Sequence, residues 1–290
     1  VINVYHYSDS PPMLEKEMIK EPRMWQLVME PTSDTLSVMA FSPIEHHTLI
    51  AEDIPLASSA TPLKAFQEAV YDNPLLLSDF SRVTILLPER RALPVPDILS
   101  SDEARRQAFA NAFPPATADS PEEIIAEELP GLGATMLTGV NREFLGFLRR
   151  TFNNPRVGHT LTPLALYFKA KHPTRPRGKM IVNLRQGRCD IVILGDTAPM
   201  VMNSYPVRDP MDSVYYIMAC REGFGLTPTD EIILAGDTAS RGAVAPVLRR
   251  FVRYVMPAIF PSTMFRAGRA ALRTPFEMIV APLALPHSIP

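Results

Sequence analysis

The chain has 290 residues, which is enough for one large domain or for two lobes with separate cores. Its hydrophobic content of 46% is typical of a globular protein, and none of its apolar runs is long enough to span a bilayer. The sequence has 30 prolines, only 13 glycines, and neither GxGxxG nor GxxxxGK[ST], which excludes P-loop and Rossmann nucleotide sites.

The net charge of −2 is unevenly distributed along the chain. Residues 1–140 hold 9 basic and 21 acidic side chains, a balance of −12, whereas residues 141–290 hold 20 and 10, a balance of +10. We expect these halves to attract each other across a cleft or a dimer interface. The arginines are not interleaved with aromatic residues as a stacking site requires, so we predict no nucleic-acid partner.

Metal-binding spacings are absent from the sequence. Cys189 and Cys220 form no CxxC pair, and we expect two buried thiols in a cytoplasmic protein. His46 and His47 are adjacent residues of a predicted strand, so their side chains point to opposite faces. We therefore predict no metal site.

The predicted elements begin after an N-terminal arm, residues 1–24, which is charged and contains prolines. Three β-like segments follow: WQLVME, TLSVMAFS and TLIAEDIPL. A helix is expected after Thr61, a good N-cap that precedes a proline, and RVTILLP from Arg82 is typical of a short buried strand.

The same order of elements returns in the second half of the chain. The strands KMIVNL, CDIVIL and APMVMNSYPV are followed by a helix with Asp209 as its cap and by the strand DEIILAG. The cap lies 21 residues before the strand in both halves, from Thr61 to Arg82 and from Asp209 to Asp230. This weak duplication predicts two lobes with mixed sheets of the same strand order, over about 25–95 and 179–256.

Residues 97–134, between the repeats, are predicted to be a helical insertion that includes an acidic helix, EEIIAEEL, ending near Gly131. TMLTGV is predicted to be a strand, and helices are expected from Asn141 to about Thr151 and from Thr162 to about Lys171. The predicted N-terminal lobe is therefore 25–140 and the C-terminal lobe 141–256.

Two predictions concern the end of the chain. An amphipathic helix is expected after Gly242, with Leu248, Phe251, Val252 and Val255 on its apolar face. The segment FEMIVAPLAL is predicted to be a last strand within the C-terminal segment, 257–290.

This layout, three strands, a helix and a strand occurring twice, resembles the actin-like ATPase superfamily, which includes chaperones, sugar kinases and pilus-assembly ATPases. The hairpin NLRQGRCDIVIL, Asn183 to Leu194, resembles the chaperone phosphate hairpin DLGGGTxDVxxL. LAGDTASRGAV, from Leu234, resembles the adenosine loop LVGGxxRxP, and MLTGVNREFLGFLRRTFNNPRVGHTLTPLALYFKA is similar to the region joining the lobes of pilus-assembly ATPases. As a whole the chain resembles an uncharacterised bacterial family, a domain of unknown function. The resemblance implies an α/β protein of the actin-like ATPase (ribonuclease H-like) fold.

The resemblance places candidate nucleotide-binding residues in two loops. These are Asn183, Arg185, Gln186, Gly187 and Arg188 in the hairpin, and Gly236 and Asp237 in the adenosine loop. Asn183 replaces a metal-holding acid, and long side chains replace two glycines that let amides reach phosphate. The hairpin is interpreted as a plain structural turn, an altered anion or nucleotide site, or, least favoured, a hydrolytic site.

Two further loop residues bear on the same question. Glu30 precedes Pro31 where a first phosphate loop is expected, and we interpret it as a solvated residue at a strand end. Asp237 is expected to cap the following turn. No catalytic residue is identified.

From these features we predict a protein that is not an active enzyme, a pseudo-ATPase without a cofactor or metal. It would act as a binding or assembly module with a protein partner or a second copy, without membrane insertion. The alternatives are an ATP-binding ATPase or kinase-like protein with altered phosphate loops, and a binder of an anionic small molecule.

Overall fold

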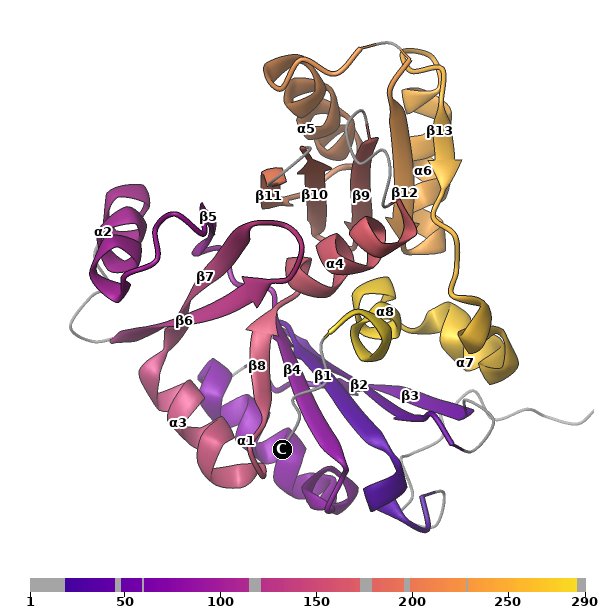
Figure 1. Ribbon diagram of the computed structural model, residues 1–290. Coiled ribbons are helices and arrows are strands. Elements are labelled where there is room, and N and C mark those ends of the chain that lie inside the picture. The colour runs from indigo at the N-terminus through magenta and orange to yellow at the C-terminus, as the bar shows by residue number, and fades with distance from the viewer. Residues whose placement is uncertain are drawn as a thin grey trace, which may run out of the picture.

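The chain forms two lobes, each built on a five-stranded mixed sheet, and a smaller three-stranded sheet beside the first lobe (Figure 1). The computed structural model describes residues 19–44, 48–58, 60–114, 121–172, 179–195, 199–227 and 229–285. The first sheet has the order β3-β2-β1-β4-β8, with β1 Gln26–Pro31, β2 Thr35–Ser42, β3 Thr48–Pro55, β4 Arg82–Leu87 and β8 Arg156–His159. The second has the order β11-β10-β9-β12-β13, with β9 Lys179–Arg185, β10 Arg188–Leu194, β11 Pro199–Pro206, β12 Glu231–Gly236 and β13 Val255–Pro257.

The predicted duplication is confirmed by the strand order of the two sheets. In each sheet the first three strands are antiparallel, and the strand after the next helix pairs in parallel with the first strand. That helix is α1, Pro62–Asp72, in the first lobe and α5, Pro210–Gly223, in the second.

Both helices begin where the sequence predicted. The Thr61 side chain accepts a hydrogen bond from Lys64 N, with proline at the first helical position of α1. Asp209 and Asp212 form a capping box at the start of α5. The same local chemistry therefore starts the same helix in both lobes.

Helices cover the outer face of each sheet and fill the space between the lobes. α1 and α3, Arg142–Thr151, pack on the first sheet, whereas α5 and α6, Thr238–Leu248, pack on the second. α4, Leu161–Lys171, and α8, Phe276–Ala284, lie between the lobes, where their side chains join the inner faces of both sheets in one core (Figure 1). Every residue of α4 from Leu161 to Phe168 is buried, because apolar side chains surround this helix on all sides.

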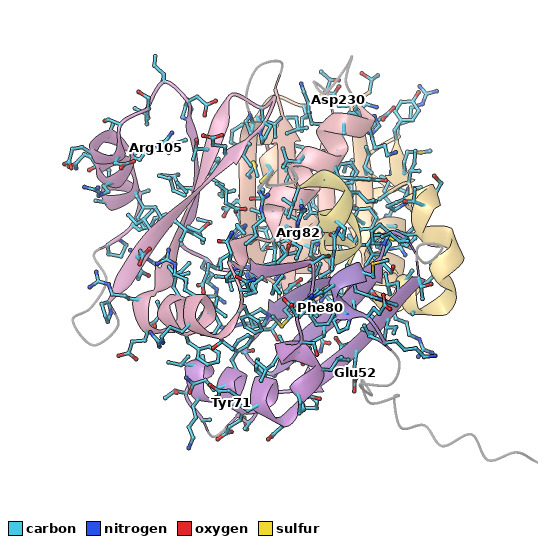
Figure 2. All side chains as sticks on the ribbon, turned by 60° about the horizontal axis from the view of Figure 1, so that its bottom comes forward. Glu52, Tyr71, Phe80, Arg82, Arg105 and Asp230 are labelled. Atoms are coloured by element: carbon cyan, nitrogen blue, oxygen red, sulfur yellow. The ribbon has the colours of Figure 1, made fainter. Side chains whose placement is uncertain are left out.

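Four further helices are short. They are the 3-10 helices η2 Pro22–Met24, η3 Pro74–Leu77 and η4 Ser262–Ala267, and the helix α7 Gly268–Arg273. Figure 2 shows Tyr71 of α1 on the outer side of the first lobe, and Asp230 at the end of the second lobe. Among the helices that the structure describes, none combines the length and apolar character needed to cross a bilayer.

The insertion is largely β-structure, so the prediction of a helical segment over 97–134 is wrong in part. β5 Ala92–Pro96, β7 Ala134–Asn141 and β6 Glu122–Leu129 form the third sheet, and α2 Asp102–Ala112 packs beside it. The acidic segment EEIIAEEL is strand β6 rather than a helix, because it pairs along its whole length with the apolar strand β7. Tertiary pairing thus outweighs the helix preference of glutamate.

Of two predictions near the C-terminus, the helix after Gly242 is wrong in part and the last strand is wrong. α6 ends at Leu248, Phe251 is 60% exposed, and Val255 begins strand β13 instead of extending a helix. FEMIVAPLAL forms helix α8, not a strand, since it is buried between α4 and both sheets and not beside an open sheet edge.

The first lobe extends past the predicted boundary at residues 140 and 141. The N-cap side chain of Asn141 accepts from Phe144 N as expected, but α3 then packs on the first sheet, and β8 pairs in parallel with β4. The chain therefore returns to the first lobe before it crosses to the second through α4. His46 and His47 lie outside the described residues.

Candidate functional site

A cavity of about 690 Å³ lies between the two lobes. The β9–β10 turn, from Arg185 to Arg188, forms one wall, and the β1–β2 turn with Thr32 and Ser33 forms the opposite wall. Gly187 has a φ of +75°, a conformation that favours glycine and allows the two strands to be joined by a two-residue turn. The loop that resembles a phosphate hairpin therefore faces the first lobe.

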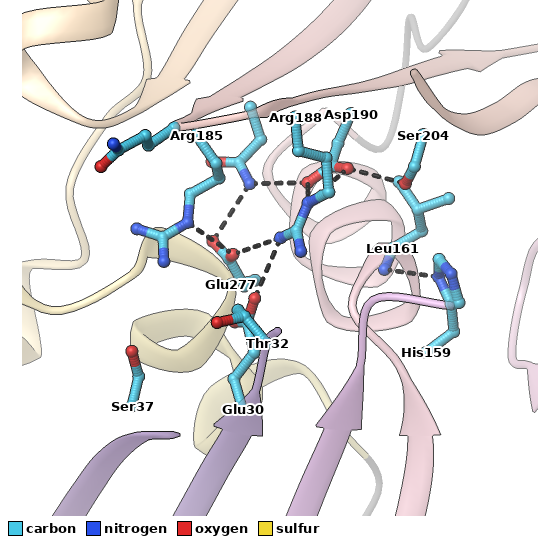
Figure 3. Close-up of polar contacts among 12 residues, drawn as sticks. Glu30, Thr32, Ser37, His159, Leu161, Arg185, Arg188, Asp190, Ser204 and Glu277 are labelled. Carbon is cyan, nitrogen blue, oxygen red and sulfur yellow. Dashed lines mark hydrogen bonds and ion pairs between the residues drawn. The ribbon is translucent and has the colours of Figure 1, made fainter. Parts of the chain in front are cut away.

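Arg188 is the centre of a buried ion-pair network in this cleft (Figure 3). Its Nη2 atom donates to Glu30 Oε1 at 3.1 Å and to Glu277 Oε1 at 2.8 Å. Its Nε atom lies 3.0 Å from Asp190 Oδ1. Burial alone would lower the pKa of Arg188, but the three surrounding carboxyl groups raise it, so the guanidinium keeps its charge.

The network joins three parts of the chain. Glu30 belongs to β1 of the first lobe, Arg188 and Asp190 belong to β10 of the second, and Glu277 belongs to α8. Asn183, on β9, is fully buried and donates from Nδ2 to Asp190 Oδ2 and Glu277 Oε2, both at 3.0 Å. The neutral residue that replaces a metal-holding acid thus bridges two carboxylates.

Glu30 is buried, so its interpretation as a solvated residue is wrong. Burial and the nearby Glu277 together raise the pKa of Glu30 to about 8, against the opposing effects of Arg188 and Arg185. The same cluster lowers the pKa of Glu277, because Arg185 and Arg188 outweigh its burial. Near pH 7 the Glu30 carboxyl group therefore carries a proton, whereas Glu277 is ionised.

Asp237 closes the other side of the hairpin turn. Its Oδ1 atom accepts from Arg185 Nη1 at 2.8 Å, and its Oδ2 atom accepts from the backbone N–H of Gln186 at 2.9 Å. It occupies the N-cap position of α6 but makes no side-chain capping bond, so the capping prediction is wrong. The Asp237 carboxylate therefore accepts the hydrogen bonds that this turn would donate to a bound anion.

Gly236 allows this close contact between the adenosine-like loop and the hairpin. Its φ is +94°, and the Asp237 N–H donates to Leu184 O at 2.8 Å. A Cβ atom at Gly236 would overlap the backbone of Leu184. The predicted candidates in the hairpin and the adenosine-like loop are therefore neighbours in space.

The expected attraction between the acidic and basic halves takes place mainly inside the first lobe. Arg149 pairs with Glu123, and Arg156 lies 3.8 Å from Glu127, but both arginines belong to the first lobe. Among the contacts of charged side chains between described residues, the hydrogen bond from Arg188 to Glu30 joins the two lobes.

A second buried polar cluster joins the insertion to the helix between the lobes. Glu127 of β6 accepts from His159 N at 2.7 Å and from Thr162 Oγ1 at 2.9 Å, at the start of α4. Leu161 N donates to His159 Nδ1, so the Nε2 atom carries the proton and donates to Glu89 O at 2.9 Å. Burial lowers the pKa of His159 to about 4, so the imidazole is neutral.

Comparison with known proteins shows the family of this chain. A family model described as "Protein of unknown function (DUF3822)" matches residues 16–255. The chain belongs to the DUF3822 family. No curated protein sequence matches it.

Solved structures show the fold of this DUF3822 chain. A crystal structure of a Bacteroides thetaiotaomicron VPI-5482 protein, described as having an actin-like ATPase fold and unknown function, has 18% identity and a TM-score of 0.72, covering 82% of this chain and 91% of that one. A PilM–PilN complex of type IV pilus biogenesis has 14% identity and a TM-score of 0.55, covering 92% of this chain and 100% of that one. The chain therefore has the actin-like ATPase fold, as the sequence resemblance implied.

The sequence pattern of this DUF3822 chain did not reveal Glu277 or Asp190 as part of the cleft. A single acid within the apolar run FEMIVAP was the available signal for Glu277, because an isolated charge in a buried helix requires a partner. Among the residues that the structure describes, no group of three or more His, Cys, Asp or Glu is placed to hold a metal ion. Both cysteines are buried and free, as expected.

Proposed function

We propose that this chain is a non-catalytic binding or assembly module, a pseudo-ATPase whose cleft is closed by internal ion pairs. The observation that carries the proposal is the position of the Arg188 guanidinium between Glu30 of the first lobe and Asp190 and Glu277 (Figure 3). A metal–nucleotide complex at the hairpin needs a carboxylate that can hold a hydrated cation and backbone N–H groups that can donate to phosphate. Neither requirement fits the residues present.

The Arg188 guanidinium already occupies the position of a cation beside the carboxyl groups of the cleft. Glu30 and Asp190 both lie about 3 Å from Arg188 nitrogen atoms, so a divalent ion between them would meet a buried guanidinium. A metal ion at Glu30 would also have to displace the proton that this buried carboxyl group holds near pH 7. These contacts support a cleft that is neutralised by the protein itself.

The anion position at the turn is also taken by the protein. A phosphate would have to displace the Asp237 carboxylate from Gln186 N and from Arg185 Nη1. Each charged hydrogen bond is worth about 1.5–3 kcal/mol, so the competition lowers nucleotide affinity by roughly 3–6 kcal/mol. Because about 1.4 kcal/mol is tenfold, a micromolar site would become millimolar or weaker.

The fixed arrangement of the two lobes supports the binding role. The two lobes, α4 and α8 form one core, and a buried hydrogen bond from Arg188 to Glu30 joins the lobes, which makes a fixed frame for a partner. PilM, which has the same fold, is seen in a complex with PilN. A protein partner for the present chain is our proposal by analogy with that complex.

A second candidate, a binder of an anionic small molecule, is favoured by two other arginines of the cleft. Arg90 and Arg273 line the same cavity, and neither is paired with a carboxylate among the described contacts. In this alternative, as in an ATP-binding protein with altered loops, arginine side chains replace the backbone contacts of a phosphate loop.

Titration calorimetry with Mg-ATP on the intact protein tests the proposal. We expect binding no tighter than millimolar, and Asp237→Ala should tighten the binding of inorganic phosphate by tenfold or more because it frees Gln186 N and Arg185. Asp34→Ala is the matched control, since it removes another carboxylate from the same cavity without touching the hairpin. Micromolar Mg-ATP binding that Arg185→Ala abolishes would refute the pseudo-ATPase proposal and favour the ATP-binding alternative.

A further inference from the structure

A second cavity, of about 600 Å³, lies within the first lobe and shares Thr32, Ser33 and Pro88 with the wall of the cleft. It forms where the carboxyl ends of β1 and β4 meet the N-terminal ends of α1 and α3. Leu63 of α1 and Phe144 of α3 give it an apolar surface. Ligand pockets of 300–1,000 Å³ commonly combine such an apolar surface with a few polar groups.

The Glu89 carboxyl group is the first of these polar groups. It lines the cavity, is only partly exposed, and makes no hydrogen bond or ion pair with any residue that the structure describes. Burial raises the pKa of Glu89, and the charge of Glu122 raises it further. Among the residues that the structure describes, the cavity lining includes a second carboxyl group, Glu143, and no Lys, Arg or His.

Glu89 is held in place through its backbone rather than its side chain. Its carbonyl oxygen accepts the 2.9 Å bond from His159 Nε2, so the residue is fixed while its carboxyl group stays without a cation. A carboxylate that is partly desolvated and unpaired favours a ligand with a positive charge.

Two backbone N–H groups add a different requirement. The caps of α1 and α3 satisfy Lys64 N and Phe144 N, and Arg142 N donates to Pro121 O. Within the described part of the chain, the N–H groups of Leu63 and Glu143 have no acceptor, and both residues line the cavity. A ligand that has carbonyl oxygens, a cation and apolar groups therefore complements this cavity.

We propose that this cavity binds a short peptide segment of a partner protein, with apolar side chains against Leu63 and Phe144 and a lysine or arginine at Glu89. A peptide supplies all three groups together, and the volume accommodates a few residues. This inference deepens the proposed binding function, because it gives the chemistry of the partner that the module recognises.

The test is fluorescence anisotropy with pooled, end-blocked hexapeptides on the full chain. One pool has apolar residues around a fixed lysine, and the matched pool has norleucine in place of the lysine. We expect the lysine pool to bind at least tenfold more tightly, because the charged hydrogen bond is lost with norleucine. Glu89→Gln should remove that difference, whereas Glu128→Gln, the same change at an exposed position of β6, should preserve it.

Leu63→Trp provides a second, independent variant. The larger ring is expected to fill the cavity and weaken the binding of both pools by tenfold or more. Equal binding of the two pools, lysine-pool binding unchanged by Glu89→Gln or Leu63→Trp, or displacement of the peptides by spermine would overturn the inference. These variants leave Arg188 and Asp237 intact, so Mg-ATP binding would overturn only the pseudo-ATPase proposal, and a failure of peptide binding would overturn only this inference.

Discussion

Replacing Arg188 by methionine removes the cation that three buried carboxyl groups share. Methionine keeps most of the side-chain volume, so the main effect is electrostatic. Glu30 carries a proton near pH 7, which leaves Asp190 and Glu277 as the charges without this partner. Removing one member of a buried ion pair typically costs about 3–5 kcal/mol, because the remaining charge stays desolvated.

Other contacts of the two carboxylates limit the loss of unfolding free energy in Arg188→Met to about 3–5 kcal/mol. Arg185 Nε remains 3.2 Å from Glu277 Oε1, and Ser204 Oγ still donates to Asp190 Oδ1 at 2.7 Å. For a chain of this size, 1 kcal/mol shifts the melting temperature by about 2–4 °C, so Arg188→Met should lower it by roughly 6–20 °C.

Urea and thermal unfolding at pH 7 measure this effect, with Arg106→Met as the matched control. Arg106 pairs with Glu103 on the exposed face of α2, and such surface pairs are worth about 0–1 kcal/mol. A loss below 1 kcal/mol for Arg188→Met, or one equal to the control, would refute the interpretation of the cleft as an internally neutralised network.

Three further predictions concern single residues. The pKa of Glu30 rises from its ordinary 4.5 to about 8, so between these pH values the native state keeps a proton that the unfolded state releases. The free energy of unfolding should therefore fall as the pH rises from about 4.5 to 8 and then level off. Glu30→Gln should flatten this pH profile, as urea unfolding can measure. Gly158→Ala should lower the unfolding free energy by several kcal/mol, since a Cβ atom there would overlap the carboxyl group of Glu127; an unchanged midpoint would contradict this packing. Burial raises the pKa of the Cys189 thiol, so iodoacetamide should modify Cys189 only after unfolding, as mass spectrometry of native and denatured samples can show.

The local parts of the fold could be predicted because neighbouring residues determine them. Thr61 and Asp209 each precede a proline and start equivalent helices, and the strand order follows from the repeated spacing. Predictions failed where distant contacts decide the structure. β6 is a strand because β7 pairs with it, and α8 is a helix because it is buried between the lobes.

The candidate site was predictable in position but not in chemistry. The hairpin resemblance named Arg185 and Arg188 as candidate nucleotide-binding residues, and both line the cavity between the lobes. The partners of these arginines come from elsewhere: Glu277 is 94 residues from Asn183, in a segment predicted to be a strand. No local pattern in the hairpin indicates that a distant acid neutralises it.

The cleft network also bears on how the two lobes can move. Glu30, Arg188 and Glu277 lie on three different elements, so opening the cleft must break the buried hydrogen bond from the Arg188 guanidinium to Glu30. Buried ion pairs contribute little net stability compared with apolar packing, but breaking one is costly. The network therefore favours one relative position of the lobes over alternatives without making the fold much more stable. A protein whose cleft opens and closes with nucleotide needs the opposite balance, and for that reason we propose a fixed binding frame and not a catalytic cycle.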